Sequence, residues 1–150
     1  MEALDLTVRP PRGPRVPLAG CVFMARMVDK IRAQLPGGAI GEYLVDGPGT
    51  LGGYQFHKLR LNVDEVRAFV GQASDEEEVA AWLLERINPT VVEEVNGKLT
   101  ALRIDGGTPE DFTNTVEHHP WLRDRPEIKN AFEMLEVDDA VHFPGVKVPR

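Results

Sequence analysis

The sequence predicts a mainly α-helical fold, a compact bundle of about five or six helices with an extended, proline-rich N-terminal arm. The chain has 150 residues and is 42% apolar, which suits one domain with a hydrophobic core. From residue 62 onward, apolar residues recur at the three- and four-residue spacing of helices. We therefore expect a single domain over residues 1–150, with a glycine-rich loop after the first helix.

Residues 1–17 are expected to form a docked arm. Proline fixes φ and removes an amide donor, so the prolines of this segment favour an extended backbone; they are Pro10, Pro11, Pro14 and Pro17. Residues 1–35 hold six Lys/Arg and three Asp/Glu (+3), whereas residues 36–150 hold eleven and twenty-one (−10). We favour an arm that lies on the acidic body through this charge difference, and the alternative is that its arginines gather around an anion.

The first helix is predicted over residues 18–35. An apolar row runs along its length, and Arg26, Asp29 and Lys30 occupy the opposite row. Because Asp29 lies three positions from both Arg26 and Arg32, these side chains are expected to pair on the helix surface.

A glycine-rich loop is predicted over residues 36–61. It contains a short extended segment at residues 40–45 and a turn at residues 46–49. A loop of this length is often functional. The glycines of residues 47–53 are interpreted as turns, because they match neither a phosphate-binding loop nor a dinucleotide fingerprint.

The helical body is predicted over residues 62–139, and local signals mark where its helices begin. Asn62 is an N-cap, Ser74 and Glu77 form a capping box, and Asn88 precedes a proline suited to the first turn.

Residues 90–104 have two interpretations. The pair Asn96-Gly97 is typical of a hairpin. The positions of Val92, Val95, Leu99 and Leu102 fit a helix better than strict alternation. We favour the helix, in which Gly97 costs about 1 kcal/mol relative to alanine.

The last two helices are predicted to begin near Thr108 and Asp124, the first with Phe112 and Val116 facing inward. After the second, the pair Asp138-Asp139 is expected to form a solvated turn, followed by a tail at residues 140–150. The expected core consists of Val22, Val28, Ile31, Val66, Phe69, Trp82, Leu83, Phe132 and Leu135.

Composition excludes several classes of function. A net charge of −7 argues against nucleic acid, and no apolar run reaches the ~20 residues of a membrane span. The acidic start lacks a signal pattern, so we expect a cytoplasmic protein, with Cys21 buried and inert. We expect no metal, no cofactor and no catalytic triad, because the four histidines and the single serine lack the required spacings. The histidine pair His118-His119 is expected to cap a helix end.

The candidate ligand-binding residues lie in the arm, the first helix and the loop. Guanidinium forks suit carboxylate or phosphate, and a tyrosine hydroxyl orients such a group. The cluster is either an anion site or an internal salt-bridge network, and we favour the network. Arg26, Asp29 and Glu42 are expected to meet at least one arm arginine. The full set is Arg9, Arg12, Arg26, Asp29, Lys30, Glu42 and Tyr43.

These residues resemble an uncharacterised bacterial family known as domain of unknown function 5069. The resemblance rests on Asp5-Leu6-Thr7, on Arg9 to Arg12, on Arg26 to Ala33, on Gly41-Glu42-Tyr43 and on the closing segment Phe132 to Asp139. Relatives often carry Asn-Cys-Pro shortly after the Gly-Glu-Tyr. This chain has Asp-Gly-Pro at residues 46–48, so no role of that cysteine applies here. The resemblance supports the fold and the site and implies no activity.

The expected function is a soluble cytoplasmic small-ligand-binding or protein-interaction domain without catalysis. Its partner is expected to be a small anion or a protein. The alternative is a small enzyme for an anionic carboxylate or phosphate substrate, with Arg26 or Arg12 holding the anion and Glu42 as acid or base. No histidine lies in the cluster, which favours binding over catalysis.

Overall fold

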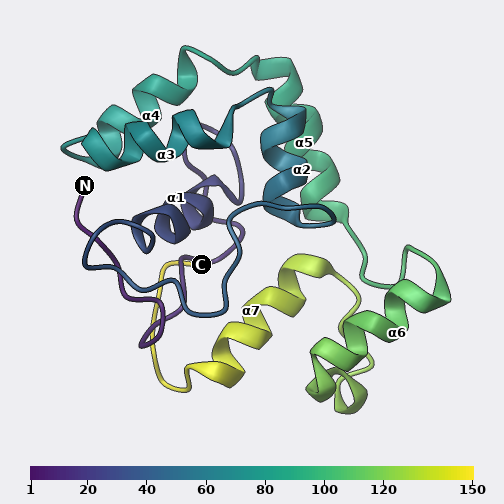
Figure 1. Ribbon diagram of the computed structural model, residues 1–150. Coiled ribbons are helices and arrows are strands. Elements are labelled where there is room, and N and C mark those ends of the chain that lie inside the picture. The colour runs from purple at the N-terminus through teal and green to yellow at the C-terminus, as the bar shows by residue number, and fades with distance from the viewer.

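The fold is mainly helical, as predicted (Figure 1). The computed structural model describes residues 1–150, apart from the side chains of residues 110–112, so the expected inward position of Phe112 lies outside the described residues. Among the described residues, β pairing is limited to isolated bridges. No described helix is both long and apolar enough to cross a bilayer. The elements are α1 (Met24–Arg32), α2 (Leu51–Lys58), α3 (Val63–Gln72), α4 (Glu76–Leu84), α5 (Pro89–Ala101), α6 (Pro109–His118), the 3-10 helix η1 (Pro120–Asp124) and α7 (Ala131–His142).

Helix α1 is the centre of the molecule. The pair α3–α4 lies on one side of it and α7 on another, and α2 packs beside α5 (Figure 1). All residues from 24 to 31 are buried. The polar row that the sequence placed on the helix surface is therefore buried too, with Arg26 and Asp29 each only 1% exposed. That prediction is wrong because the arm, the following loop and the last helix together cover the polar row.

Helix α1 begins at residue 24 and not near residue 18. Leu18 and Cys21 exchange backbone hydrogen bonds of 3.0 and 2.9 Å around a tight turn. The turn requires positive φ, which is 50° at Ala19 and 75° at Gly20. Phe23 also has a positive φ of 68°, so the helix can start only after it.

Helix α2 lies within the segment predicted to be a loop. Its N-cap is Thr50, whose hydroxyl accepts a 3.0 Å hydrogen bond from the amide of Gly53. A Cβ at Gly52 would overlap the carbonyl oxygen of Val45 and lie 2.6 Å from Cε of Met27. The glycines that suggested turns therefore include one that lets α2 approach α1.

Helices α3, α4 and α5 of the body begin at the predicted capping residues, except that one cap lies one residue further along the chain. Asn62 caps α3 as predicted, by accepting from the amides of residues 64 and 65. The predicted box of Ser74 and Glu77 is wrong by one position, because Asp75 caps the amide of Glu78 and Glu78 accepts from the amide of Ser74. Helix α5 confirms the helical interpretation of residues 90–101.

Helix α7 begins and ends later than predicted. Asn130 caps it by accepting from the amides of residues 132 and 133, and residues 120–124 form η1 instead. The helix continues to His142, so Asp138 and Asp139 are helical. Their expected position in a solvated turn is wrong.

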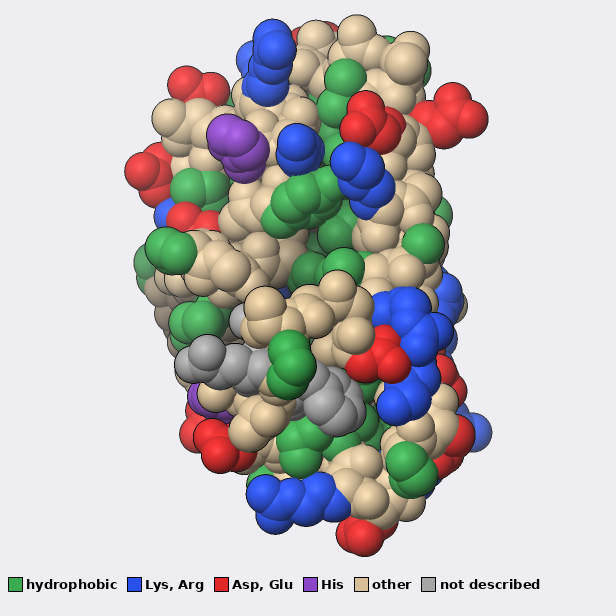
Figure 2. All heavy atoms as spheres, turned by 90° about the vertical axis from the view of Figure 1, so that its right-hand side faces the viewer, with side chains coloured by type: hydrophobic (Ala, Val, Ile, Leu, Met, Phe, Trp, Pro, Cys, Tyr) green, Lys and Arg blue, Asp and Glu red, His purple; other side chains and the backbone are tan. Residues whose placement is uncertain are grey.

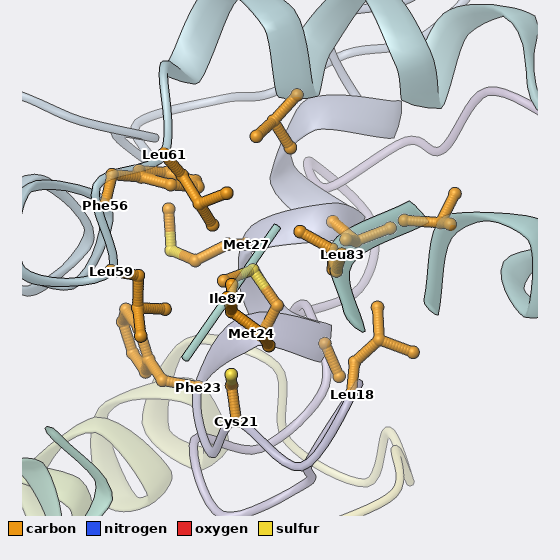
Figure 3. Close-up of a cluster of buried hydrophobic side chains, with 14 of the residues drawn as sticks. Leu18, Cys21, Phe23, Met24, Met27, Phe56, Leu59, Leu61, Leu83 and Ile87 are labelled. Atoms are coloured by element: carbon orange, nitrogen blue, oxygen red, sulfur yellow. The ribbon is translucent and has the colours of Figure 1, made fainter. Parts of the chain in front are cut away.

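The hydrophobic core surrounds α1 (Figure 3). Phe132 of α7 is fully buried and stacks on Phe23, with ring centroids 5.7 Å apart. Phe69 and Trp82 stack at 4.9 Å on the partly buried edge of this core. The core prediction is confirmed for Val28, Ile31, Val66, Leu83 and Phe132, whereas Val22, Phe69, Trp82 and Leu135 are only partly buried.

The arm is docked along the body. The amide of Leu6 donates to Ala39 over 2.7 Å, and the amide of Ala39 donates to Leu4 over 3.0 Å. At the other end, Gly13 donates to Pro149 over 2.8 Å. A Cβ at Gly13 would lie 2.8 Å from Cα of Arg150, so the C-terminal tail lies directly on the arm.

Candidate functional site

A buried ion pair joins the first helix to the last. Arg26 donates to the two carboxylate oxygens of Asp139 over 2.6 and 3.0 Å, and both residues are buried. The hydroxyl of Tyr43 donates to Asp139 over 2.9 Å, and its ring lies 5.5 Å from the guanidinium of Arg26. Arg26 also donates to the carbonyl of Arg12 over 3.0 Å. One pair thus connects the arm, α1, the following loop and α7.

Asp139 is the site residue that sequence reasoning missed. It was expected in a solvated turn, yet it is 7% exposed on α7. A signal for it exists in the sequence. Asp139 follows Phe132 by seven positions and Leu135 by four, so it continues the apolar stripe of that helix. A carboxylate on a buried stripe implies a buried cationic partner.

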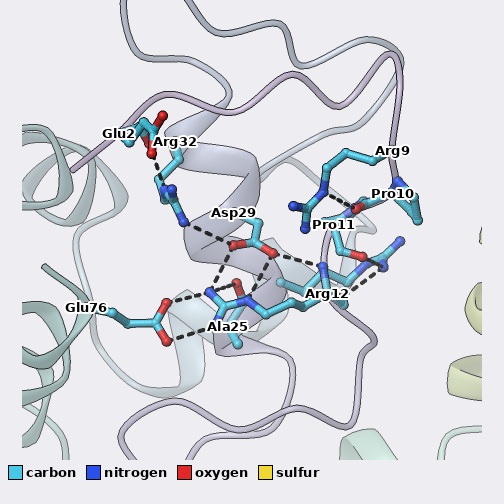
Figure 4. Close-up of polar contacts among 10 residues, drawn as sticks. Glu2, Arg9, Pro10, Pro11, Arg12, Ala25, Asp29, Arg32 and Glu76 are labelled. Carbon is cyan, nitrogen blue, oxygen red and sulfur yellow. Dashed lines mark hydrogen bonds and ion pairs between the residues drawn. The ribbon is translucent and has the colours of Figure 1, made fainter. Parts of the chain in front are cut away.

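A second ion pair holds the arm to α1 (Figure 4). Arg12 binds Asp29 from Nε over 3.0 Å and from Nη2 over 2.9 Å, and its backbone amide donates to Asp29 over 2.9 Å. Its guanidinium also reaches Glu76 of α4 over 2.8 and 2.6 Å. Burial lowers the pKa of Arg12, but its hydrogen bonds to Glu76 and Asp29 outweigh burial and raise the pKa above its ordinary value. Arg32 lies 3.9 Å from Asp29 on the far side.

Lys30 lies beside the first pair. Its Nζ donates to the carbonyl of Leu44 over 2.9 Å and lies 5.6 and 5.7 Å from the rings of Phe23 and Tyr43. Burial, together with the charge of Arg26, lowers the pKa of Lys30 to about 7. Burial and the nearby carboxylate of Asp139 raise the pKa of Tyr43.

The remaining candidates, Arg9 and Glu42, are not part of either ion pair. Arg9 donates from Nε to the carbonyl of Pro10 over 3.4 Å. Glu42 is exposed, and no described side chain forms a hydrogen bond or ion pair with it. The predicted pairing of Arg26 with Asp29 along the helix is also wrong, because each pairs with a residue from another segment.

Most charged groups of this cluster are paired with other groups of the same chain. Among the described buried side-chain atoms, Nε of Arg26 and Oε1 of Gln55 are the ones without a hydrogen-bond partner. A bound anion would have to displace Asp29 or Asp139 from an existing pair. The described contacts of these ion pairs link the arm, the loop and the helices.

A separate cleft lies between α2 and the end of α5. It has a volume of about 1230 Å³ and is lined by residues from the segments 46–57, 61–63, 98–103 and 106–107. In Figure 2, apolar side chains line a hollow on this face of the molecule, and basic side chains and a histidine lie along one side of it. The sequence did not reveal the cleft, because its walls come from segments far apart in the chain.

The walls of the cleft are apolar and its rim is charged. Phe56, Leu61 and Leu99 are buried residues that also line it. The rim carries His57, Lys98, Arg103 and Asp46. Asp46 is paired with Arg67 over 2.6 Å, and Arg103 with Asp105 over 2.8 Å.

The other histidines have structural contacts. Nδ1 of His118 lies 2.7 Å from the carbonyl of Asn114, so His118 caps the end of α6 as predicted. The same role was expected of His119, but its ring lies 2.9 Å from the carboxylate of Asp138 on α7, so that part of the prediction is wrong. Asp138 also accepts a 2.9 Å hydrogen bond from Trp121. Burial raises the pKa of Asp138, but these two hydrogen bonds outweigh burial and lower the pKa. Among the described residues, no group of three or more His, Cys, Asp or Glu could hold a metal ion.

Comparison with known proteins identifies one family. The model of a domain of unknown function, DUF5069, matches residues 8–141. None of the curated proteins matches the chain. The match includes the arm arginines, the ion pair of α1 with α7, and the cleft.

Proposed function

The chain belongs to the DUF5069 family, whose function is unknown, and we propose that it is a cytoplasmic small-ligand-binding domain without catalysis. The ligand binds in the cleft between α2 and α5. The observation that carries this proposal is the cleft itself, with a volume of about 1230 Å³ and largely apolar walls. Ligand pockets are concave, mostly apolar and about 300–1,000 Å³ in size, and an open cleft somewhat exceeds that range.

The buried ion pairs support this proposal because they hold in place the helix on which a wall of the cleft packs. Arg26 with Asp139 and Arg12 with Asp29 fix α1 against the arm and α7. Helix α2 packs on α1 through Gly52. A wall of the cleft is thereby held in place before a ligand arrives, which reduces the entropy lost on binding.

Catalysis receives less support than binding. An enzyme for an anionic substrate needs a free cation and a free acid or base near it. Arg12 and Arg26 are paired with carboxylates, and Glu42 is exposed without a described partner. A protein partner in place of a small ligand is an outcome of the experiment below.

The test uses one substitution in the cleft and one outside it. Ala101 lines the cleft and is exposed, so Ala101→Trp narrows the cleft without disturbing the core. Ala81 on α4 is also exposed on a helix and does not line the cleft, so Ala81→Trp is the matched control. The neutral dye Nile red, whose fluorescence rises in apolar surroundings, reports occupancy.

We expect saturable one-to-one binding of Nile red to the native chain and to Ala81→Trp. Binding should be markedly weaker in Ala101→Trp. Equal fluorescence from all three proteins, or none from the native chain, would contradict the proposal. A native chain that binds no dye and instead forms a stable complex through this face would point to a protein partner.

A further inference from the structure

We infer that the cleft selects an amphipathic carboxylate, with its apolar body between α2 and α5 and its carboxylate at the basic rim. This inference rests on the proposed function and names its ligand class. It uses the cleft and its rim, and none of the residues of the buried ion pairs.

The walls favour an apolar body. Phe56, Leu61 and Leu99 continue the hydrophobic core to the surface of the cleft. Leu102 adds a large apolar side chain that is 42% exposed, and the half-buried Tyr54 also belongs to the lining. A ligand that covers these side chains removes apolar surface from water, which is the main source of affinity in such sites.

The charges at the rim favour an anionic head. Lys98, Arg103 and His57 are basic side chains, and Asp46, the one acid among the described lining residues, is already paired with Arg67. Among the described residues Lys98 forms an ion pair with Glu94, over 3.4 Å, and more than half of each of the two side chains is exposed. An exposed pair of this kind is weak, so Lys98 is available to a ligand. This basic rim belongs to a chain whose net charge is −7.

Arg103 adds a donor at the same rim. It holds Asp105 through Nε and Nη2, both over 2.8 Å. In the described part of the chain no hydrogen bond uses its Nη1. That nitrogen can donate to a carboxylate while Asp105 keeps the guanidinium in place.

A phosphate head fits this rim less well. Phosphate sites commonly use backbone amides of a glycine-rich turn at a helix N-terminus. The equivalent amides at the start of α2 are partly occupied, because Gly53 donates to Thr50 and Thr50 donates to Gly47. The rim offers side chains suited to a single negative charge.

The experiment compares probes that share an apolar body and differ in the head. Decanoate, decanol and decylamine are titrated by displacement of Nile red, below their aggregation concentrations. We expect decanoate to bind about tenfold more tightly than decylamine. Lys98→Gln should weaken the binding of decanoate by about three- to tenfold and leave the binding of decanol unchanged. Lys147→Gln, in the tail and away from the cleft lining, is the matched control and should change neither.

The outcomes separate the two proposals. If all three probes bind equally and Ala101→Trp weakens the binding of each, the carboxylate selectivity is overturned and the binding function stands. A preference for decylamine, or Nile red binding without decanoate binding, also overturns the selectivity. If neither Nile red nor any probe binds, the proposed function fails together with this inference.

Discussion

At the residue scale, the pair of Arg26 and Asp139 has the largest expected effect on stability. Two buried charges are costly to desolvate, and the cost is offset only while both remain. We expect Asp139→Asn to lower the free energy of unfolding by about 3–5 kcal/mol, because it leaves the Arg26 cation buried without its counter-charge. Unfolding in urea at neutral pH measures this.

The double variant Arg26→Met with Asp139→Leu is the control for that experiment. It removes both charges and keeps the apolar volume, so it should recover most of the lost stability. A single substitution that costs less than about 1 kcal/mol would show that the pair adds little and that α7 is held by its apolar stripe alone.

Lys30 should make stability depend on pH. Its pKa is about 7 in the folded chain, against an ordinary value of 10.5. Between these values the unfolded chain binds a proton that the folded chain does not, so stability rises with pH across this window. Below about pH 7 the amine is charged in both states, and this dependence ends.

The substitution Lys30→Met should remove this dependence. We expect the free energy of unfolding of the native chain to gain up to about 1.4 kcal/mol per pH unit more than that of the variant, between pH 7 and 10. Lys58→Met, at an exposed lysine of α2, is the control and should keep the native slope. Parallel pH profiles for the native chain and Lys30→Met would show that Lys30 titrates normally.

At the element scale, α5 does not require a glycine at position 97. It lies in the helix, and a Cβ there would meet no atom within 4 Å. We expect Gly97→Ala to raise the free energy of unfolding by about 0.5–1 kcal/mol, because alanine has the higher helix propensity.

The matched control is Gly37, which is also open to a Cβ but has a φ of +87°. Alanine is strained in that conformation, so Gly37→Ala should lower the stability by about 1 kcal/mol. Thermal or urea unfolding of both variants measures the contrast. Effects of the same sign would contradict it.

The elements that the sequence predicted correctly are those with local signals. Asn62 and Asn88 cap α3 and α5 through amides two and three residues away, so the sequence contains all that these starts require. The start of α1 depends on a tight turn at Ala19, and α2 depends on the close approach of Gly52 to another segment. The turn is local, but Ala19 and Phe23 are not residues that usually adopt positive φ, so the sequence does not signal it. The approach of Gly52 to Met27 is tertiary, and no local pattern encodes it.

The contacts of the candidate site also fall into those that the sequence predicted and those that it did not. Arg26, Asp29 and Glu42 were predicted to meet an arm arginine. Asp29 and Arg26 both contact Arg12, because the arm enters α1 directly, whereas Glu42 forms no hydrogen bond or ion pair with a described side chain. Asp139 lies 113 residues beyond its partner Arg26, and no spacing rule connects such positions. The cleft also depends on the packing of α2 against α5, which a single sequence does not determine.

At the scale of the whole molecule, the N-terminal arm connects elements that do not otherwise follow each other. Through Arg12 it contacts α1 and Glu76 of α4, and through Gly13 it contacts the C-terminal tail. Its backbone also supports the loop at Ala39. The excess of positive charge in residues 1–35 over the acidic remainder favours this arrangement at long range.

We therefore expect the arm to open only when the whole chain unfolds. The amides of Leu6 and Gly13 donate across to other segments, so their hydrogen exchange should require a free energy close to that of global unfolding. The amide of Thr7 bonds only within the arm, to Asp5, and should exchange far faster. In Asp29→Asn, which weakens the hold on Arg12, protection of Leu6 and Gly13 should fall more than that of the α5 amides. If Leu6 and Gly13 exchange as fast as Thr7 in the native chain, the arm is a frayed end, and the link that it makes between α1, α4 and the tail does not hold the fold.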